Sequence, residues 1–320
     1  MTDSASGISG APRIVVVGDH LTADERERVL AMAPDARFVA SIDEVDDLSQ
    51  VTGIGGPFAP LAVAAMPRLT WQHSWAAGPD SYVTDDLRSS DVVLTSSVGN
   101  GAVPLAEHAM WLMLTLNRDA LRWVDNQRAH RWQRFSHGEL AGLTLGIVGL
   151  GHSGEDLAAK AKAFHMRVIA TRRRPQLGGA VDEVRGPGEL AWLLAESDFV
   201  VVTAPLTDET RGMFGEAEFS AMKPSAFWIC FSRGGIAVDA ALLKALDEGW
   251  IAGAGIDAHG VEPLPADSPF WDAPNTIITP HNGATSHQTP RRGLEIFLEN
   301  LRRHLAGESL VNVVDLEAGY

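Results

Sequence analysis

The strongest constraint on the fold is an apolar segment that ends in three closely spaced glycines. Residues 145–154 read LGIVGLGHSG, which places the pattern G-x-G-x-x-G between a strand-like segment and a helical pattern at residues 155–164. In such a turn the first glycine permits a tight bend, the second lets the backbone approach a pyrophosphate, and the third lets the helix pack closely on the strand. Because a helix N-terminus also attracts an anion, this context favours a dinucleotide-binding turn over a purely structural one. We therefore expect a dinucleotide to be bound by Gly149, Gly151, His152, Ser153 and Gly154.

The end of the next expected strand indicates which dinucleotide is bound. Thr171 is followed by Arg172, Arg173 and Arg174, and no carboxylate stands at this strand end. A carboxylate here would read the ribose 2′-hydroxyl and repel a 2′-phosphate, whereas guanidinium groups bind a phosphate through paired hydrogen bonds. The sequence therefore predicts NADP(H) in preference to NAD(H), with NAD(H) still possible, and places Thr171, Arg172 and Arg173 at the cofactor. A solvated basic turn is the alternative interpretation.

Strand-like and helical segments alternate along both halves of the chain. A length of 320 residues suits two domains, and the alternation predicts parallel sheets built from βαβ units. Strands are expected at residues 14–18, 38–39, 69–74, 92–95, 145–149, 167–171, 199–203, 227–231, 253–256 and 276–279. Helices are expected at 24–33, 155–164 and 291–305, with one long helix from Pro104 to Trp123 and a short extended segment at 310–314.

Charge and cysteine content limit the partners to be expected. The formal net charge of −15 repels nucleic acid and anionic membranes. No apolar run approaches the ~18 residues of a membrane span, and residues 1–4 lack the pattern of a signal peptide. The single cysteine, Cys230, cannot form an intrachain disulfide, and no Cys/His spacing resembles a metal site. We therefore expect a soluble, cytoplasmic protein with no metal, nucleic acid or membrane partner.

Three segments that follow expected strands carry residues suited to reducing a keto acid. Hydride transfer to such a substrate needs a cation for the carboxylate, a general acid for the oxygen, and a group that holds the proton on that acid. Arg233 lies in residues 232–235 (SRGG), Glu262 in 257–264 (DAHGVEPL) and His281 in 279–283 (TPHNG). Alone, each would be read as an ordinary surface or structural residue. Their common position at strand ends, where open α/β sheets place their sites, favours a shared site.

These segments also resemble those of a known family. Together with residues 74–80 (SWAAGPD), 98–108 (VGNGAVPLAEH) and 203–213 (TAPLTDETRGM), they are similar to the D-isomer-specific 2-hydroxyacid dehydrogenases, especially the glyoxylate/hydroxypyruvate reductase-like branch. The resemblance extends from about residue 12 to residue 315. It implies an NADPH-dependent reduction of a small 2-keto acid to the D-2-hydroxy acid.

The resemblance further implies an architecture. The fold would be α/β, with two doubly wound parallel-sheet domains and the active site in the cleft between them. A flavodoxin-like substrate domain would comprise residues 1–102 and 287–320, and a Rossmann cofactor domain would comprise residues 103–286. The protein would be a homodimer, with the helix near Pro104 at its interface.

The same resemblance implies a role for individual residues. His281 would be the general acid and base, Glu262 would pair with it and hold its proton, and Arg233 would bind the substrate carboxylate and keto oxygen. The backbone at Ala76, Ala77 and Gly78 would bind the other side of the carboxylate. Asp257 would contact the nicotinamide carboxamide. The remaining cofactor contacts would come from Thr203, Ala204, Pro205, His281 and Gly283.

Some positions depart from the family pattern. His152 stands where the family often has arginine beside the pyrophosphate, and Cys230 stands where asparagine is usual. His259 and Gly260 replace a common Val-Phe pair. We interpret Cys230 as a structural residue and His259 as a structural or pocket-lining residue.

Several alternatives remain at this point. An NAD-dependent enzyme that oxidises a hydroxy acid and a nucleotide-sensing protein like the family's co-repressor relatives are the rival functions. The substrate side chain is not specified, although Phe58, Trp75 and Trp132 are candidates to line its pocket. A dimer interface would explain Trp111, Trp123 and Trp132, but core packing explains the first two equally well.

Overall fold

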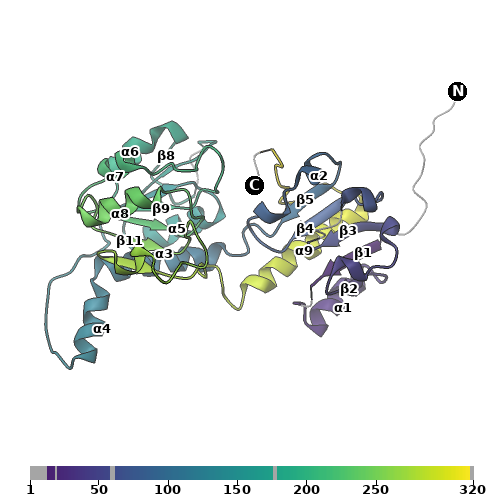
Figure 1. Cartoon of the computed structure of the whole chain (residues 1–320), viewed down its shortest axis with the longest axis horizontal. Coiled ribbons are helices and arrows are strands. Elements are labelled where there is room, and N and C mark those ends of the chain that lie inside the picture. The colour runs from purple at the N-terminus through teal and green to yellow at the C-terminus, as the bar shows by residue number, and fades with distance from the viewer. Residues whose placement is uncertain (1–12, 19, 58–61, 176–178, 318–320) are drawn as a thin grey trace. The chain divides into compact units, whose positions relative to one another are not determined.

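The structure is a computed structural model that describes residues 13–18, 20–57, 62–175 and 179–317. Contacts between residues divide the chain into two compact units (Figure 1). The first unit combines residues 1–100 with residues 290–320 and is here called the outer unit, because it contains both ends of the sequence. The second comprises residues 101–289, the middle of the sequence, and is called the central unit. The predicted domain boundaries at 102/103 and 286/287 fall within a few residues of this division.

The outer unit is built on a five-stranded parallel sheet with the order β2-β1-β3-β4-β5. This is the strand order of flavodoxin-like folds. The strands are β1 (Arg13–Val17), β2 (Arg37–Val39), β3 (Val51–Gly55), β4 (Trp71–Ser74) and β5 (Val93–Ser96), and the helices are α1 (Ala23–Met32), α2 (Asp85–Arg88) and α9 (Thr289–Ala306). Short 3₁₀ helices lie at Ile42–Glu44, Leu48–Gln50, Val63–Ala65 and Asp80–Tyr82.

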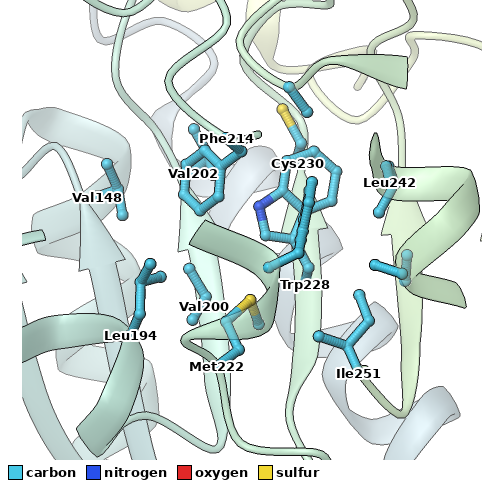
Figure 2. Packing of buried hydrophobic residues seen from close by; sticks show 14 of the residues in the cluster. Val148, Leu194, Val200, Val202, Phe214, Met222, Trp228, Cys230, Leu242 and Ile251 are labelled. Atoms are coloured by element: carbon cyan, nitrogen blue, oxygen red, sulfur yellow. The ribbon is translucent and has the colours of Figure 1, made fainter. Parts of the chain in front are cut away.

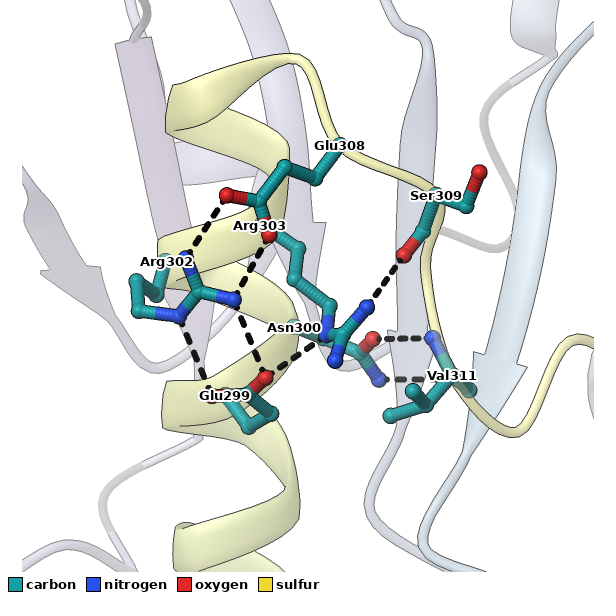
Figure 3. Close-up of polar contacts among 7 residues, drawn as sticks. All are labelled: Glu299, Asn300, Arg302, Arg303, Glu308, Ser309 and Val311. Atoms are coloured by element: carbon teal, nitrogen blue, oxygen red, sulfur yellow. Dashed lines mark hydrogen bonds and ion pairs between the residues drawn. The ribbon is translucent and has the colours of Figure 1, made fainter.

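The last long helix, α9, packs on the sheet formed by the beginning of the chain. Phe297 and Leu301 of this helix lie in one apolar cluster with Ile14 of β1 and Trp71 of β4. Asn300, a buried residue of α9, exchanges two hydrogen bonds with the backbone of Val311, which lies beyond the C-terminal end of the helix (Figure 3). Polar contacts around Glu299, Arg302, Arg303 and Glu308 surround this junction. They hold the C-terminal segment against α9.

The central unit contains a seven-stranded parallel sheet with the order β12-β11-β10-β9-β6-β7-β8. Counted from β6, this is the 3-2-1-4-5-6 order of the Rossmann fold with one strand added. The strands are β6 (Thr144–Val148), β7 (Arg167–Thr171), β8 (Glu183–Arg185), β9 (Phe199–Val202), β10 (Phe227–Cys230), β11 (Gly253–Ile256) and β12 (Thr276–Ile278). The predicted fold class, two parallel-sheet α/β units, is confirmed.

Helices cover both faces of this sheet, so inner strands such as β9 bury apolar side chains on both faces. Phe199 and Val201 of β9 join the cluster under α3 (Ala102–Asn117) and α5 (His152–Ala163). Val200 and Val202 point to the opposite face and join the cluster around Trp228 (Figure 2). That face is covered by α6 (Leu190–Glu196), α7 (Glu216–Ser220) and α8 (Asp239–Asp247), with 3₁₀ helices at Pro187–Glu189 and Pro269–Asp272.

The prediction of one long helix from Pro104 to Trp123 is wrong. The helix α3 ends at Asn117, and a second helix, α4 (Ala120–Arg128), begins after Asp119, which adopts a left-handed φ of 48°. Aspartate tolerates this conformation better than most residues. The apolar residues of α4 that suggested a continuation are exposed, because α4 projects away from the sheet (Figure 1).

Two strands were not predicted, and the short extended segment predicted at residues 310–314 pairs with the sheet of the outer unit at one position. β3 contains two glycines, and β8 is a short, charged edge strand, so neither shows a strong strand pattern. Residues 310–314 form only a single antiparallel bridge, between Thr95 and Val313. Among the helices of the described residues, none is long and apolar enough to cross a membrane.

Candidate active site

The strands β9 to β12 are parallel neighbours, so their carboxyl ends meet at one edge of the central sheet. Hydrogen bonds then tie the segments beyond them together. The Asp257 amide donates to the Cys230 carbonyl at 2.8 Å, and the Thr279 amide donates to the Ile256 carbonyl at 2.9 Å. The three segments singled out in the sequence therefore do follow adjacent strands of the same sheet.

His281 and Glu262 form a hydrogen-bonded pair. The ring Nδ1 of His281 lies 2.9 Å and 2.8 Å from the two carboxylate oxygens of Glu262. The two side chains are 39% and 37% exposed, so a ligand in solution can reach them. Because a carboxylate only accepts, Nδ1 carries the proton of this bond, and the opposite ring nitrogen, Nε2, is the one that can exchange a proton with a ligand. His281 has a φ of 50°, an uncommon conformation of the kind found at functional sites.

The carboxylate of Glu262 is held in its charged form. Burial alone would raise the pKa of Glu262, but hydrogen bonds from the His259 amide and the His281 ring outweigh it and hold the pKa below its usual value. The His259 amide lies 2.8 Å from Oε1 of Glu262. The pair therefore presents a carboxylate anion to the Nδ1–H of the His281 ring.

Asp257 organises the loop that carries His281. Its carboxylate is fully buried and accepts hydrogen bonds from the Thr279 hydroxyl at 2.6 Å and from the amides of Asn282 and Gly283 at 3.1 and 3.0 Å. Nε2 of His108 lies 3.0 Å from the same hydroxyl. Burial lowers the pKa of His108, and the Asp257 charge only partly offsets this. Sequence reasoning found neither His108 nor this role of Asp257, whose contact with the nicotinamide stays a prediction.

Arg233 lies in a turn that only glycine can complete. Its Nη1 donates to the Ser232 carbonyl at 2.8 Å. A Cβ on Gly234 would lie 1.9 Å from the His259 carbonyl oxygen, which no side chain permits, and Gly235 has a φ of 81°. The turn thus packs directly against the backbone of the segment that carries Glu262.

The glycine-rich turn has the shape that a pyrophosphate requires. Gly149 has a φ of 90°, and a Cβ there would lie 2.7 Å from the Ala204 amide nitrogen. A Cβ on Gly154 would lie 2.8 Å from the Gly149 carbonyl oxygen, whereas one on Gly151 would have open space around it. The Thr203 hydroxyl donates to the Gly149 carbonyl and fixes the turn. Because α5 begins directly after Gly151, with His152 exposed, the amide end of this helix adjoins that space and fits a dinucleotide phosphate.

The predicted 2′-phosphate residues follow β7. Thr171 is buried, Nη1 of Arg172 lies 3.6 Å from Glu155 in the first turn of α5, and Nη2 of Arg173 lies 3.7 Å from Glu209. Arg172 is therefore next to the helix end that would receive the phosphates. Its guanidinium is a suitable partner for a further phosphate beside that position.

The predicted substrate-binding loop follows β4 in the outer unit. The Ala76 amide donates to the Ser74 hydroxyl at 3.2 Å, and the Ala76 carbonyl accepts from the Ser97 amide at 3.2 Å. The backbone of Ala76 is thus used within the loop, and carboxylate binding by Ala77 and Gly78 stays a prediction. Phe58, the proposed pocket residue, lies outside the described residues.

Other predicted features are also placed by the structure. Cys230 is buried, and burial raises the pKa of its thiol, which agrees with a structural role. Trp111, Trp123 and Trp132 are 47%, 38% and 97% exposed, so core packing does not explain them. Among the described residues, no group of three or more His, Cys, Asp or Glu side chains could hold a metal ion.

Comparison with known proteins points to the same dehydrogenase family that the sequence motifs resemble. The sequence profile of the D-isomer specific 2-hydroxyacid dehydrogenase NAD binding domain matches residues 110–283. A glyoxylate reductase of Korarchaeum cryptofilum is 33% identical over 294 residues, which cover 89% of this chain and 88% of the relative.

Solved structures agree. A D-isomer specific 2-hydroxyacid dehydrogenase of Xanthobacter autotrophicus in complex with NADPH and MES has a TM-score of 0.85 and 30% identity, covering 97% of this chain and 100% of that one. An NADPH-dependent glyoxylate/hydroxypyruvate reductase of Sinorhizobium meliloti in complex with NADP and sulfate has a TM-score of 0.83 with the same identity and coverage.

The fold and the site thus define an oxidoreductase with a nicotinamide-binding domain. More specifically, this chain belongs to the D-isomer-specific 2-hydroxyacid dehydrogenase family.

Proposed function

We propose that this protein uses NADPH to reduce a small 2-keto acid, of the glyoxylate or hydroxypyruvate type, to the D-2-hydroxy acid. The observation that carries the proposal is the His281–Glu262 pair, which lies at the same sheet edge as the Arg233 turn. The glycine-rich turn in the same unit and the activities named for the relatives support the proposal. Within the described residues, no specific feature favours an oxidative enzyme or a nucleotide sensor.

Arg233, His281 and Glu262 each have a separate task in the proposed reaction. Arg233 binds the substrate carboxylate through charge-assisted hydrogen bonds, with the amides of Ala77 and Gly78 as a second proposed binding group. When the cofactor is bound, the hydride for the substrate carbonyl carbon would come from its nicotinamide. His281 donates the proton on Nε2 to the substrate oxygen, and Glu262 stabilises the imidazolium before that transfer.

The preference for NADPH rests on the cationic end of β7. Arg172 lies next to the first turn of α5, and Thr171 presents no acidic side chain at the ribose position. A guanidinium there favours a 2′-phosphate over a 2′-hydroxyl. The NADPH and NADP bound in two solved relatives are consistent with this preference.

We also propose a homodimer formed through α3, α4 and the segment after them. Large apolar side chains are exposed along this part of the central unit: Trp111, Leu121, Trp123, Val124 and Trp132. An exposed apolar surface of this kind commonly marks a protein–protein contact. Sedimentation of the purified protein tests the dimer.

The buried, single cysteine fits a reducing cytoplasm, which cell fractionation tests.

The decisive assay follows loss of NADPH and of NADH in parallel with glyoxylate, hydroxypyruvate, pyruvate and phenylpyruvate. We expect turnover with NADPH to exceed turnover with NADH. Arg172→Gln should lower the ratio of kcat/KM for NADPH over NADH by about 10- to 100-fold, the effect of losing a charged hydrogen bond. Arg167→Gln, which removes the same charge at the other end of β7, is the matched control. An unchanged ratio in Arg172→Gln would reject the cofactor assignment, and no turnover with any acid would reject the reductase function.

A further inference from the structure

His259 lies where the three segments of the candidate site meet. Its side chain is almost completely buried, with 8% of the residue exposed. It follows β11 and precedes Glu262 by three residues, so it belongs to the same turn as the acidic member of the pair. Three separate contacts converge on it.

The first contact fixes Glu262. The backbone amide of His259 donates to Oε1 of Glu262 at 2.8 Å. The same oxygen lies 2.9 Å from Nδ1 of His281. One carboxylate oxygen therefore joins the His259 amide to the His281 ring.

The second contact fixes the loop of His281 through the imidazole of His259. Nε2 of His259 lies 3.1 Å from the Thr279 carbonyl oxygen, and because a carbonyl only accepts, Nε2 carries the proton. The same carbonyl accepts the backbone amide of His281 at 3.0 Å. The ring thus binds the turn that gives His281 its left-handed backbone conformation.

The third contact connects the backbone of His259 to the Arg233 turn. Gly234 packs so closely on the His259 carbonyl that a Cβ would lie 1.9 Å from its oxygen. The nearest atoms to that position belong to the main chain of His259 and Gly260, and none belongs to the His259 ring. A change in its side chain should therefore act on the His281–Glu262 pair and leave the Arg233 turn in place.

The bond to Thr279 is what orients the His259 imidazole, because the other ring nitrogen, Nδ1, forms no hydrogen bond with a described residue. Nδ1 of His259 is buried and has no hydrogen-bond partner among the described residues. His259 lines a small cavity of about 10 Å³ together with Trp228 and Asp239. Since no described residue forms a hydrogen bond with Nδ1, the bond from Nε2 to the Thr279 carbonyl is the hydrogen bond that sets the direction of the ring.

We infer that His259 is a positioning residue, which holds Glu262 by its amide and the His281 loop by its ring and so fixes the geometry of the pair. The inference deepens the proposed function and rests on it for its kinetic consequences. The hydrogen-bond geometry itself is a property of the protein without substrate.

The test compares two side chains of the same chemistry but different reach. The amide of His259→Gln can replace Nε2–H as a donor to the Thr279 carbonyl, whereas the amide of His259→Asn lies closer to the backbone and cannot. We expect His259→Asn and His259→Leu to lower kcat for keto acid reduction about tenfold, equivalent to one hydrogen bond. KM for the keto acid should change little, and His259→Gln should retain most of kcat. The control is His304→Leu, which removes a half-buried histidine from the outer unit and should leave kcat unchanged.

A second measurement does not depend on activity. Long-range ¹H–¹⁵N correlation spectra of ¹⁵N-histidine-labelled protein report which nitrogen of the neutral His281 ring carries the proton. In the wild type and in His259→Gln we expect the Nδ1–H tautomer that Glu262 selects, and in His259→Asn we expect a mixture with the Nε2–H form. Equal kinetics and equal tautomers in the Gln and Asn variants would overturn the inference. If the wild type reduces no 2-keto acid, the proposed function fails, and the tautomer comparison still decides the role of His259.

Discussion

Each unit of the molecule places a histidine at or near the end of a parallel strand, with opposite results. In the outer unit, His73 of β4 is fully buried, and its ring nitrogens lie 2.8 Å from the Thr95 hydroxyl and 3.1 Å from the Ser97 hydroxyl. Burial lowers the pKa of His73 to about 3, so the ring is neutral. In the central unit, His281 beyond β12 is 39% exposed and faces the carboxylate of Glu262.

The difference shows what turns a histidine into a proton donor. A hydroxyl both donates and accepts, so the partners of His73 suit a neutral ring. Aromatic rings of Trp71, Trp75 and Phe297 pack around it and exclude water. A carboxylate, by contrast, stabilises the charged ring, and exposure lets the proton reach a ligand. Only the second environment suits general acid catalysis.

The sharpest test of this comparison is His281→Ala. We expect kcat for keto acid reduction to fall by about 10²- to 10⁴-fold, the usual contribution of a general acid. Turnover of every 2-keto acid at the wild-type rate by His281→Ala would contradict the assignment. His73→Gln, if folded, should keep kcat close to the wild-type value.

A smaller effect is expected when the partner of His281 loses its charge. Glu262→Gln retains the shape of the side chain but cannot stabilise an imidazolium, so kcat should fall by about 10- to 100-fold, within the range of a charge-assisted interaction. Steady-state kinetics with the keto acid and NADPH measure this change. A kcat equal to that of the wild type would show that the charge of Glu262 does not contribute to the reaction.

The smallest effect is on stability and comes from the other histidine. The folded-state pKa of His73 lies below the ordinary value of 6.5. Between these two values, the unfolded chain binds a proton at His73 and the folded chain does not. This contribution to stability is present above pH 6.5 and is lost as the pH falls from 6.5 towards about 3. His73→Gln should lower the free energy of unfolding at pH 8 by about 1–3 kcal/mol through lost buried hydrogen bonds.

The same variant then tests the sign of the pH dependence. Between pH 8 and pH 5 the stability difference between the wild type and His73→Gln should shrink by about 2 kcal/mol, because the wild type alone loses the His73 contribution. Urea unfolding at the two pH values measures it. A difference that stays constant or grows on acidification would show that His73 is protonated in the folded state.

Much of the fold could be predicted because it depends on patterns within short segments. The strand, glycine turn and helix around Gly149 are adjacent in sequence, and the strands of the central sheet are apolar runs that flank them. β3 lacks such a run, because Gly53 and Gly55 replace side chains where Trp71 and Phe297 pack closely on the sheet. The break at Asp119 also had no local signal, because the apolar residues of α4 continue the pattern of α3 although they are exposed.

By itself, the sequence determined the alternation of strands and helices and the glycine-rich turn, and it singled out Arg233, Glu262 and His281 as candidate site residues. Each of these features lies in a contiguous motif of recognisable chemistry. Only the tertiary structure decided which residues surround them. The burial of Asp257 beneath the His281 loop, the contact of His108 with Thr279 and the bond from the His259 ring to the same residue all join distant segments. Parallel pairing of β10, β11 and β12 brings those segments to one edge, and hydrogen bonds at that edge depend on distances that no local pattern encodes.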